Sequence, residues 1–291
     1  MVERLNVTKT YKLYINGAFP RSESGRSMMV RSPEWDVLGH VCHASRKDLR
    51  DAVGAARKAA GGWAKRTAYN RGQILYRMAE MLEGKSEEFV AAIRATSGMS
   101  LRDARAEVGA SADRLVAFAG WADKFTQVMG CHNPVAGPYY TFTVPEATGV
   151  VSVVAPEEPS LLGLVSLLAP PLCAGCTVIA VGSERHPIAS ALFGEVCQTS
   201  DVPAGVVNVL TGSRAELLGW IASHREIDAV HAADLSEEEG RTLRLGAAEN
   251  VKRVTVREVG VDGWSADDAC ESPWWIEPFV EMKTIWHPSA T

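Results

Sequence analysis

The feature that most constrains the fold is a series of five short β-rich segments between residues 149 and 256. In chain order they read GVVSVVAP, TVIAV, GVVNVL, DAVHA and VKRVTV. Segments of helical character separate them at nearly even spacing, and the first of these, residues 161–169, carries no charge. Strands that alternate with helices in this way predict an α/β fold with a Rossmann-like, doubly wound parallel sheet.

The part of the chain before this sheet is predicted to be mostly helical. Residues 11–25 first indicate two short strands around a turn at Asn16 and Gly17. A helix then begins with a capping box formed by Ser45 and Asp48, and apolar residues follow at helical spacing. Further helices are expected near residues 74–82, 89–95 and 101–125.

Composition narrows the function classes. A net charge of -5 argues against a nucleic-acid partner, and no apolar run is long enough to span a membrane. The start, MVERLNVTKTYK, has no apolar signal-peptide core, and six cysteines without framework spacing favour reduced thiols and a cytoplasmic location. Cys173 and Cys176 form a CxxC, but no second ligand pair completes a zinc site. We therefore expect both to be small buried residues and expect no metal.

Two alternating stretches, residues 133–146 and 279–291, predict a separate arm of two β-strands. A two-stranded arm is only marginally stable alone, and its exposed edge invites pairing with another chain. The residues expected at its interface are Tyr140, Phe142 and Val144 in the first strand, and Phe279, Val280, Met282, Thr284 and Trp286 in the second.

Residues 259–278 lie between the last strand of the sheet and the second strand of the arm. They include five acidic residues and no basic one, which is typical of a linker. Trp274 and Trp275 are either anchors for another protein or fold back onto the sheet edge, and we favour the second interpretation.

Several of these segments also carry a resemblance. In order, LYINGAF, DLRDAVGAARKAAGGWAK, GVVSVVAPEEPSLL, VPAGVVNVLTG, ENVKRVTVREVG and FVEMKTIW resemble segments of the aldehyde dehydrogenase superfamily. The resemblance implies an NAD-binding-type domain from residues 1–130 and 147–258, and an oligomerisation arm from 133–146 and 279–291. It also implies that the acidic linker 259–278 replaces the whole catalytic domain of the family.

The resemblance leaves no good candidate for the catalytic nucleophile. The family's cysteine lies in the catalytic domain, whereas the one cysteine of the linker, Cys270, lies in the sequence DDACESP. Carboxylate neighbours raise the pKa of a thiol and suppress the thiolate. Cys270 also lacks the glycine and glutamine that surround the family's cysteine, so we expect no catalytic residue there.

The positions that the resemblance assigns to the cofactor have changed as well. The lysine and glutamate of the family's K-P-S-E motif hold the adenosine ribose, and this chain has Val181, Gly182, Ser183 and Glu184 instead. Asp234 stands where a glycine of the family lets the backbone approach the pyrophosphate. We expect NAD or NADP binding to be weak or absent, and we assign no cofactor.

The positions that resemble catalytic ones have changed too. Glu158 replaces an asparagine that donates to the oxyanion, and losing one such donor costs roughly 3 to 4 kcal/mol. The family's general-base glutamate aligns with Arg257, or with Glu258 after a slip of one residue. Glu157 and Glu158 are expected to be solvated loop carboxylates and not an acid–base pair, because adjacent strand-end residues point in opposite directions.

These changes predict a catalytically inactive subunit. The arm can be donated, but the catalytic domain that would receive a partner's arm is missing, so the expected partner is a full-length aldehyde dehydrogenase in a hetero-oligomer. The alternative is an NAD(P)-binding oxidoreductase of the same family with residual activity. A third reading is an interaction protein with an unrelated target.

Overall fold

Five parallel strands form the centre of the computed structural model, which describes residues 7–260 and 262–289. Their order across the sheet is β10-β9-β6-β7-β8, and every neighbouring pair is parallel. The strands are β6 (Val150–Val154), β7 (Thr177–Val181), β8 (Val207–Leu210), β9 (Ala229–Ala233) and β10 (Arg253–Arg257). The predicted doubly wound sheet is therefore confirmed.

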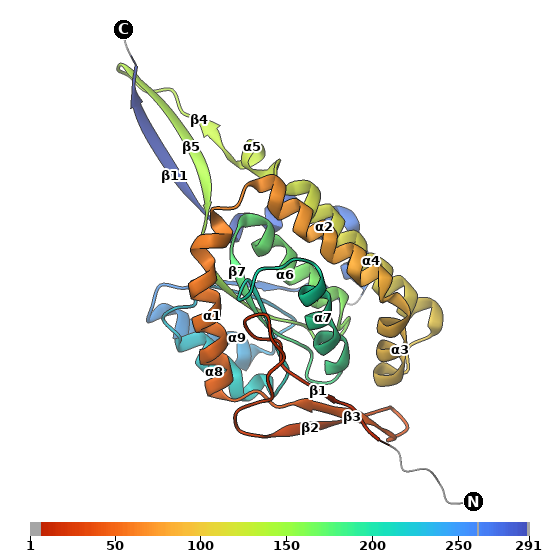
Figure 1. Cartoon of the computed structure of the whole chain (residues 1–291). Coiled ribbons are helices and arrows are strands. Elements are labelled where there is room, and N and C mark those ends of the chain that lie inside the picture. The colour runs from red at the N-terminus through yellow and green to blue at the C-terminus, as the bar shows by residue number, and fades with distance from the viewer. Residues whose placement is uncertain (1–6, 261, 290–291) are drawn as a thin grey trace, which may run out of the picture.

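Helices cover both faces of this sheet (Figure 1). The strand segments are so rich in valine, isoleucine and alanine that side chains on both faces are buried, as expected for a parallel sheet. One face packs on α6 (Leu162–Ala174) and α7 (Pro187–Thr199) and, beyond them, on the N-terminal helices α2 to α4. The other face packs on α1 (Arg46–Ala64), α8 (Arg214–Ser223) and α9 (Glu237–Ala248).

The N-terminal region is helical, as predicted. Its remaining helices are α2 (Ala68–Gly84), α3 (Ser86–Ser97), α4 (Leu101–Trp121) and α5 (Phe125–Met129). The capping box of Ser45 and Asp48 at the start of α1 is present. Before α1 lies a small sheet of β1 (Thr10–Tyr11), β2 (Ser27–Arg31) and β3 (Val37–Cys42), of which the pair β2–β3 was not predicted. The second strand expected after Asn16 and Gly17 is reduced to one bridge between Ile15 and Ala18.

The arm has three strands where two were predicted. β5 (Tyr139–Ala147) pairs antiparallel with β11 (Val280–Pro288), and the short β4 (Cys131–His132) pairs with the other side of β5. Figure 1 shows this sheet projecting from the body, at the end opposite to β1, β2 and β3.

The expected interface residues divide between different surfaces. Residues opposite each other in an antiparallel pair share a face. The register pairs Phe142 with Ile285 and Thr284 with Thr143, which places Tyr140, Phe142 and Val144 on one face and Met282, Thr284 and Trp286 on the other.

Phe279 and Val280 do not belong to the exposed arm surface at all. Phe279 is fully buried and Val280 is only 4% exposed. Both therefore join the core at the root of the arm, and their prediction as interface residues was wrong.

Residues 259–278 do not form an extended linker. Their described part folds into η1 (Asp262–Ser265), α10 (Asp267–Cys270), η2 (Pro273–Trp275) and η3 (Glu277–Phe279). Trp264 and Trp275 are buried, whereas Trp274 is 61% exposed. The Arg114 guanidinium on α4, itself fully buried, donates to the Trp264 carbonyl oxygen at 2.9 Å and holds the segment on the body.

Candidate functional site

The carboxyl edge of the sheet is where an open α/β sheet binds its ligand. The strand order reverses between β6 and β9, because β7 and β8 continue to one side and β10 lies on the other. The structure brings the sequence-predicted residues to this edge: Glu157 and Glu158 follow β6, Ser183 and Glu184 follow β7, and Asp234 follows β9. The edge therefore contains the predicted candidates, and their contacts decide what it can bind.

Arg214, which was not predicted, fills the place between β6 and β9 where the strand order reverses. We call this place the switch point. The Arg214 side chain extends from the start of α8, and Nη2 donates to the carbonyl oxygen of Ala155 at 2.6 Å. The same nitrogen lies 3.2 Å from Glu157 Oε1, and Nη1 lies 3.8 Å from Glu239 Oε1 in the first turn of α9. Arg214 is only 8% exposed, so a guanidinium occupies the space between the ends of β6 and α9.

Glu157 is a structural residue and not a solvated carboxylate as predicted. Its second oxygen accepts hydrogen bonds from Ser183 Oγ at 2.8 Å and from the Arg185 amide at 2.9 Å. Glu158 has a separate partner, His186 Nε2, at 3.0 Å. Arg185 contacts both glutamates, because its amide donates to Glu157 and its Nη1 lies 3.8 Å from Glu158 Oε1. Their other hydrogen bonds go to different residues, which fits the expectation that they are not an acid–base pair.

Helix starts along this edge are capped by the chain's own carboxylates. Glu107 Oε1 accepts from the Leu161 amide at 2.8 Å at the start of α6, and burial raises the pKa of this carboxyl group. Glu184 Oε2 accepts from the Arg214 amide at 2.9 Å at the start of α8. Amides at helix starts are the donors that bind phosphate in nucleotide sites. Here side chains of the chain already use them.

The start of α9 repeats this arrangement. Ser236 and Glu239 form a capping box, in which the Ser236 amide donates to Glu239 Oε2 at 2.8 Å. Glu237 and Glu238 add two more carboxylates to the first turn, and the exposed Asp234 precedes it with a positive φ of 49°. These carboxylates would repel the negatively charged diphosphate of a dinucleotide. The residues at this edge therefore do not fit a dinucleotide. We call Glu107, Glu157, Glu184, Glu239 and Arg214 the closed edge.

Neither Val181 nor Ser183 has a free polar side-chain group that could replace the contact of the family's lysine with the cofactor. Val181 is buried in β7, and Ser183 is fully buried with its hydroxyl hydrogen-bonded to Glu157 and to the His186 amide.

Arg257 and Glu258, the two alternatives for the family's general base, point to different surroundings. Arg257 Nε donates to His231 Nε2 at 3.1 Å, and its guanidinium lies 4.4 Å from the Trp275 ring centroid. Burial, helped by Arg257, lowers the pKa of His231 to about 3, so this imidazole is neutral. Glu258 instead lines a groove beside the start of α9.

Cys270 is enclosed and not activated. It is 1% exposed, and its Sγ lies 3.5 Å from the carbonyl oxygen of Gly263. Burial raises the pKa of the thiol, whereas Arg114 and Arg257 act in the opposite direction. The main cause is therefore burial and not the carboxylates invoked from the sequence.

The other candidate motifs have structural explanations. Cys173 and Cys176 are buried as predicted, and burial raises the pKa of Cys176 to about 11. In the described residues, no group of three or more His, Cys, Asp or Glu side chains could hold a metal ion. None of the helices described is both long and apolar enough to cross a membrane.

Comparison with known proteins identifies the family to which the chain belongs. The sequence model described as "Aldehyde dehydrogenase family" matches residues 19–265. The chain belongs to the aldehyde dehydrogenase family. Aldehyde dehydrogenase family 2 member B4 of Arabidopsis thaliana is 31% identical over 249 residues, which cover 84% of this chain and 46% of that protein. Retinal dehydrogenase 2 of Gallus gallus is 33% identical over 254 residues, which cover 85% of this chain and 48% of that protein.

Solved aldehyde dehydrogenase structures share the fold of this chain. An aldehyde dehydrogenase from Bacillus cereus, determined with NAD+, superposes with a TM-score of 0.82 at 28% identity and covers 87% of this chain and 51% of that chain. This chain therefore spans about half the length of the relatives it matches. The family match ends at residue 265, before β11, so the likeness of β11 to a family strand stays an expectation.

Proposed function

We propose that this chain is a catalytically inactive aldehyde dehydrogenase-like subunit that assembles with a full-length aldehyde dehydrogenase. The observation that carries the first half is the closed edge. The Arg214 guanidinium lies at the switch point, and carboxylates of the chain cap the adjoining helix starts. A dinucleotide would have to displace partly buried ion pairs and then face uncompensated carboxylates.

The chain also lacks good candidates for the catalytic groups of the family's reaction. The reaction of the family needs a reactive thiolate, and Cys270, the one cysteine of residues 259–278, is buried. The Glu158 carboxylate, at the place of the oxyanion donor, would repel developing negative charge. Each change weakens a different step, so no single compensating change restores activity.

The second half of the proposal rests on the arm. Among the described strands, β11 pairs only with β5, so beyond Val280, whose carbonyl oxygen accepts from Arg253, the backbone groups on its other edge have no strand partner. Tyr140, Met282 and Trp286 are about half exposed, at 51%, 48% and 58%. Exposed edges of this kind pair with another chain. The resemblance makes the catalytic-domain sheet of a full-length family member the receiving surface, and the proposed assembly is a hetero-oligomer.

Calorimetric titration of the purified chain with NAD and NADP tests the closed edge. We expect no measurable heat of binding, and no reduction of NAD when aldehydes are added. Tight binding would favour the alternative, a residual NAD(P)-dependent oxidoreductase. That alternative keeps the sheet and Glu184, although the Glu184 carboxylate is engaged by the Arg214 amide.

A further inference from the structure

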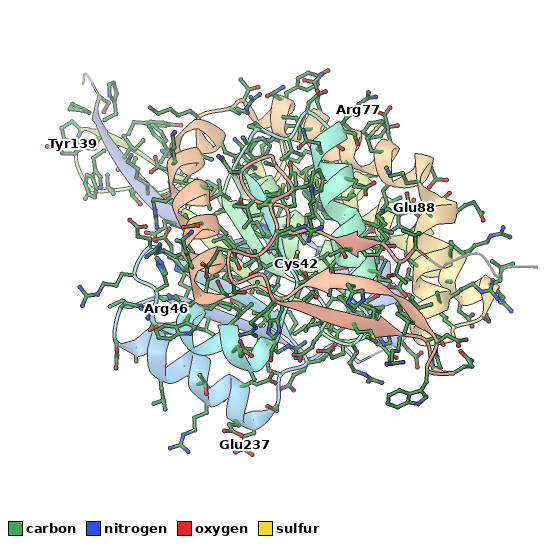
Figure 2. All side chains as sticks on the ribbon, turned by 60° about the horizontal axis from the view of Figure 1, so that its bottom comes forward. Cys42, Arg46, Arg77, Glu88, Tyr139 and Glu237 are labelled. Carbon is green, nitrogen blue, oxygen red and sulfur yellow. The ribbon has the colours of Figure 1, made fainter. Side chains whose placement is uncertain are left out.

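The outer surface of α1 and α8 carries a cluster of cationic side chains around an exposed tryptophan. The guanidinium carbon of Arg46 lies 3.8 Å from the centroid of the Trp220 ring, and Trp220 is still 41% exposed. Arg50, His224 and Arg225 help to line the adjoining hollow of about 210 Å³. Figure 2 shows Arg46 at the surface, at the start of α1. We call these five residues the arginine–tryptophan patch.

Two of the three arginines of this patch have no carboxylate partner within the described chain. No described carboxylate lies within salt-bridge distance of Arg46 or Arg225, and the closest approach to Arg50 is 3.8 Å, from Asp51. Asp51 is held more closely by a lysine at 2.6 Å, and Glu216 on α8 is held by an arginine at 2.8 Å. The whole chain has a charge of -5, so a patch with free guanidinium groups differs from its average surface.

The chemistry of the patch suits carboxylates next to an apolar group. A guanidinium stacked on an indole ring is held in place, yet its in-plane N–H groups stay free to bind a carboxylate in a bidentate manner. Tryptophan and arginine are also the residues most enriched among the energetically dominant contacts of protein interfaces. The hollow is smaller than the roughly 300 to 1,000 Å³ of small-molecule sites, so it fits peptide side chains better than a nucleotide.

We propose that the arginine–tryptophan patch docks an acidic segment of a partner protein. Carboxylates of that segment bind Arg46 and Arg225, and an apolar side chain between them packs against the exposed part of Trp220. Figure 1 shows that α1 begins at the end of the body away from the arm. The patch contains no residue of the arm, so the proposal does not depend on the proposed assembly through β11.

A labelled peptide tests this docking. The probe is a fluorescein-labelled peptide of about ten residues in which glutamates flank a central phenylalanine, and binding to the full chain is followed by fluorescence anisotropy. We expect saturable binding that weakens as salt is added. The double variant Arg46→Glu, Arg225→Glu and the variant Trp220→Ala should each lower the affinity at least about tenfold.

The control is Arg102→Glu, which reverses an exposed arginine on α4 and should leave the affinity unchanged. Circular dichroism confirms that each variant is folded, and the milder pair Arg46→Gln, Arg225→Gln replaces any variant that is not. Equal affinities of the patch and control variants would overturn the proposal, and so would no binding. Binding of inorganic phosphate, or of a glutamine version of the peptide, as tightly as the acidic peptide would also overturn it.

Discussion

The closed edge and the arm differ in whether their interacting groups are already paired within the chain. At the closed edge, where relatives are expected to bind their cofactor, charged side chains pair with one another and with helix starts. At the arm, one side of β11 has no strand partner in the described chain, and large apolar side chains stay exposed. In the proposed function, the chain has closed its chemical site and kept its associating surface. Five predictions test this contrast.

Removal of the arm strand should have the largest effect. A chain that ends after Val280 keeps the buried residues at the arm root but loses the open edge of β11. We expect complete loss of co-purification with a full-length aldehyde dehydrogenase, measured by affinity capture with native mass on the eluate. The thermal unfolding midpoint should stay within a few degrees, and full co-purification of the truncated chain would contradict the role of the arm.

Trp264→Ala should cost the most stability. This indole is fully buried between residues 259–278 and the body, and truncating a buried tryptophan costs about 4 kcal/mol of unfolding free energy. Trp274→Ala is the matched control in the same segment, because that ring is 61% exposed and its loss should cost less than about 1 kcal/mol. Urea unfolding measures both, and equal small losses would mean that the segment is a linker after all.

Arg214→Ala should open the closed edge without restoring its chemistry. The substitution leaves Glu157 and Glu239 without their guanidinium partner, and breaking such a partly buried pair from one side costs about 2 kcal/mol. NAD should still not bind, because the carboxylates remain. Arg102→Ala, on the exposed surface of α4, should change the unfolding free energy by less than about 0.5 kcal/mol. A loss for Arg214→Ala below about 1 kcal/mol would show that the contacts at the switch point are dispensable.

His231 should make stability depend on pH. Its pKa is about 3 in the folded chain, against 6.5 for an unperturbed histidine, so the unfolded chain takes up the proton first as the pH falls. Stability from this group is therefore complete above about pH 6.5 and is lost toward pH 3, by at most about 1.4 kcal/mol per pH unit. The variant His231→Asn should show a flatter dependence between these values in urea unfolding, and an unchanged slope would contradict the buried neutral imidazole.

Asp234→Gly should have the smallest effect. Asp234 has a φ of 49°, and glycine adopts this left-handed conformation without a steric penalty. We expect a gain of about 0.5 kcal/mol after the greater chain entropy of glycine is subtracted, and no gain for Asp234→Ala. Calorimetry should still detect no NAD, because three glutamates follow in the first turn of α9. Binding in this single variant would assign the loss of the cofactor to Asp234 alone.

Local patterns in the sequence predicted the central sheet well, because most of its strands are short runs rich in β-branched residues and helical segments separate them at nearly even spacing. The missed features depend on contacts between distant residues. Arg214 could not be placed at the switch point, since its partners come from β6 and α9. The acidic composition of residues 259–278 concealed Trp264 and Ile276, which are buried because the segment docks on Arg114 and its surroundings. The opposite faces of the arm follow from its register, which alternation within one strand does not reveal.

The most direct test of the proposed assembly is capture from a lysate of the cells that produce the chain, with this chain as bait and native mass measured on the eluate. We predict a stoichiometric complex that contains a full-length aldehyde dehydrogenase. A self-associated chain with no such subunit would contradict the proposed assembly.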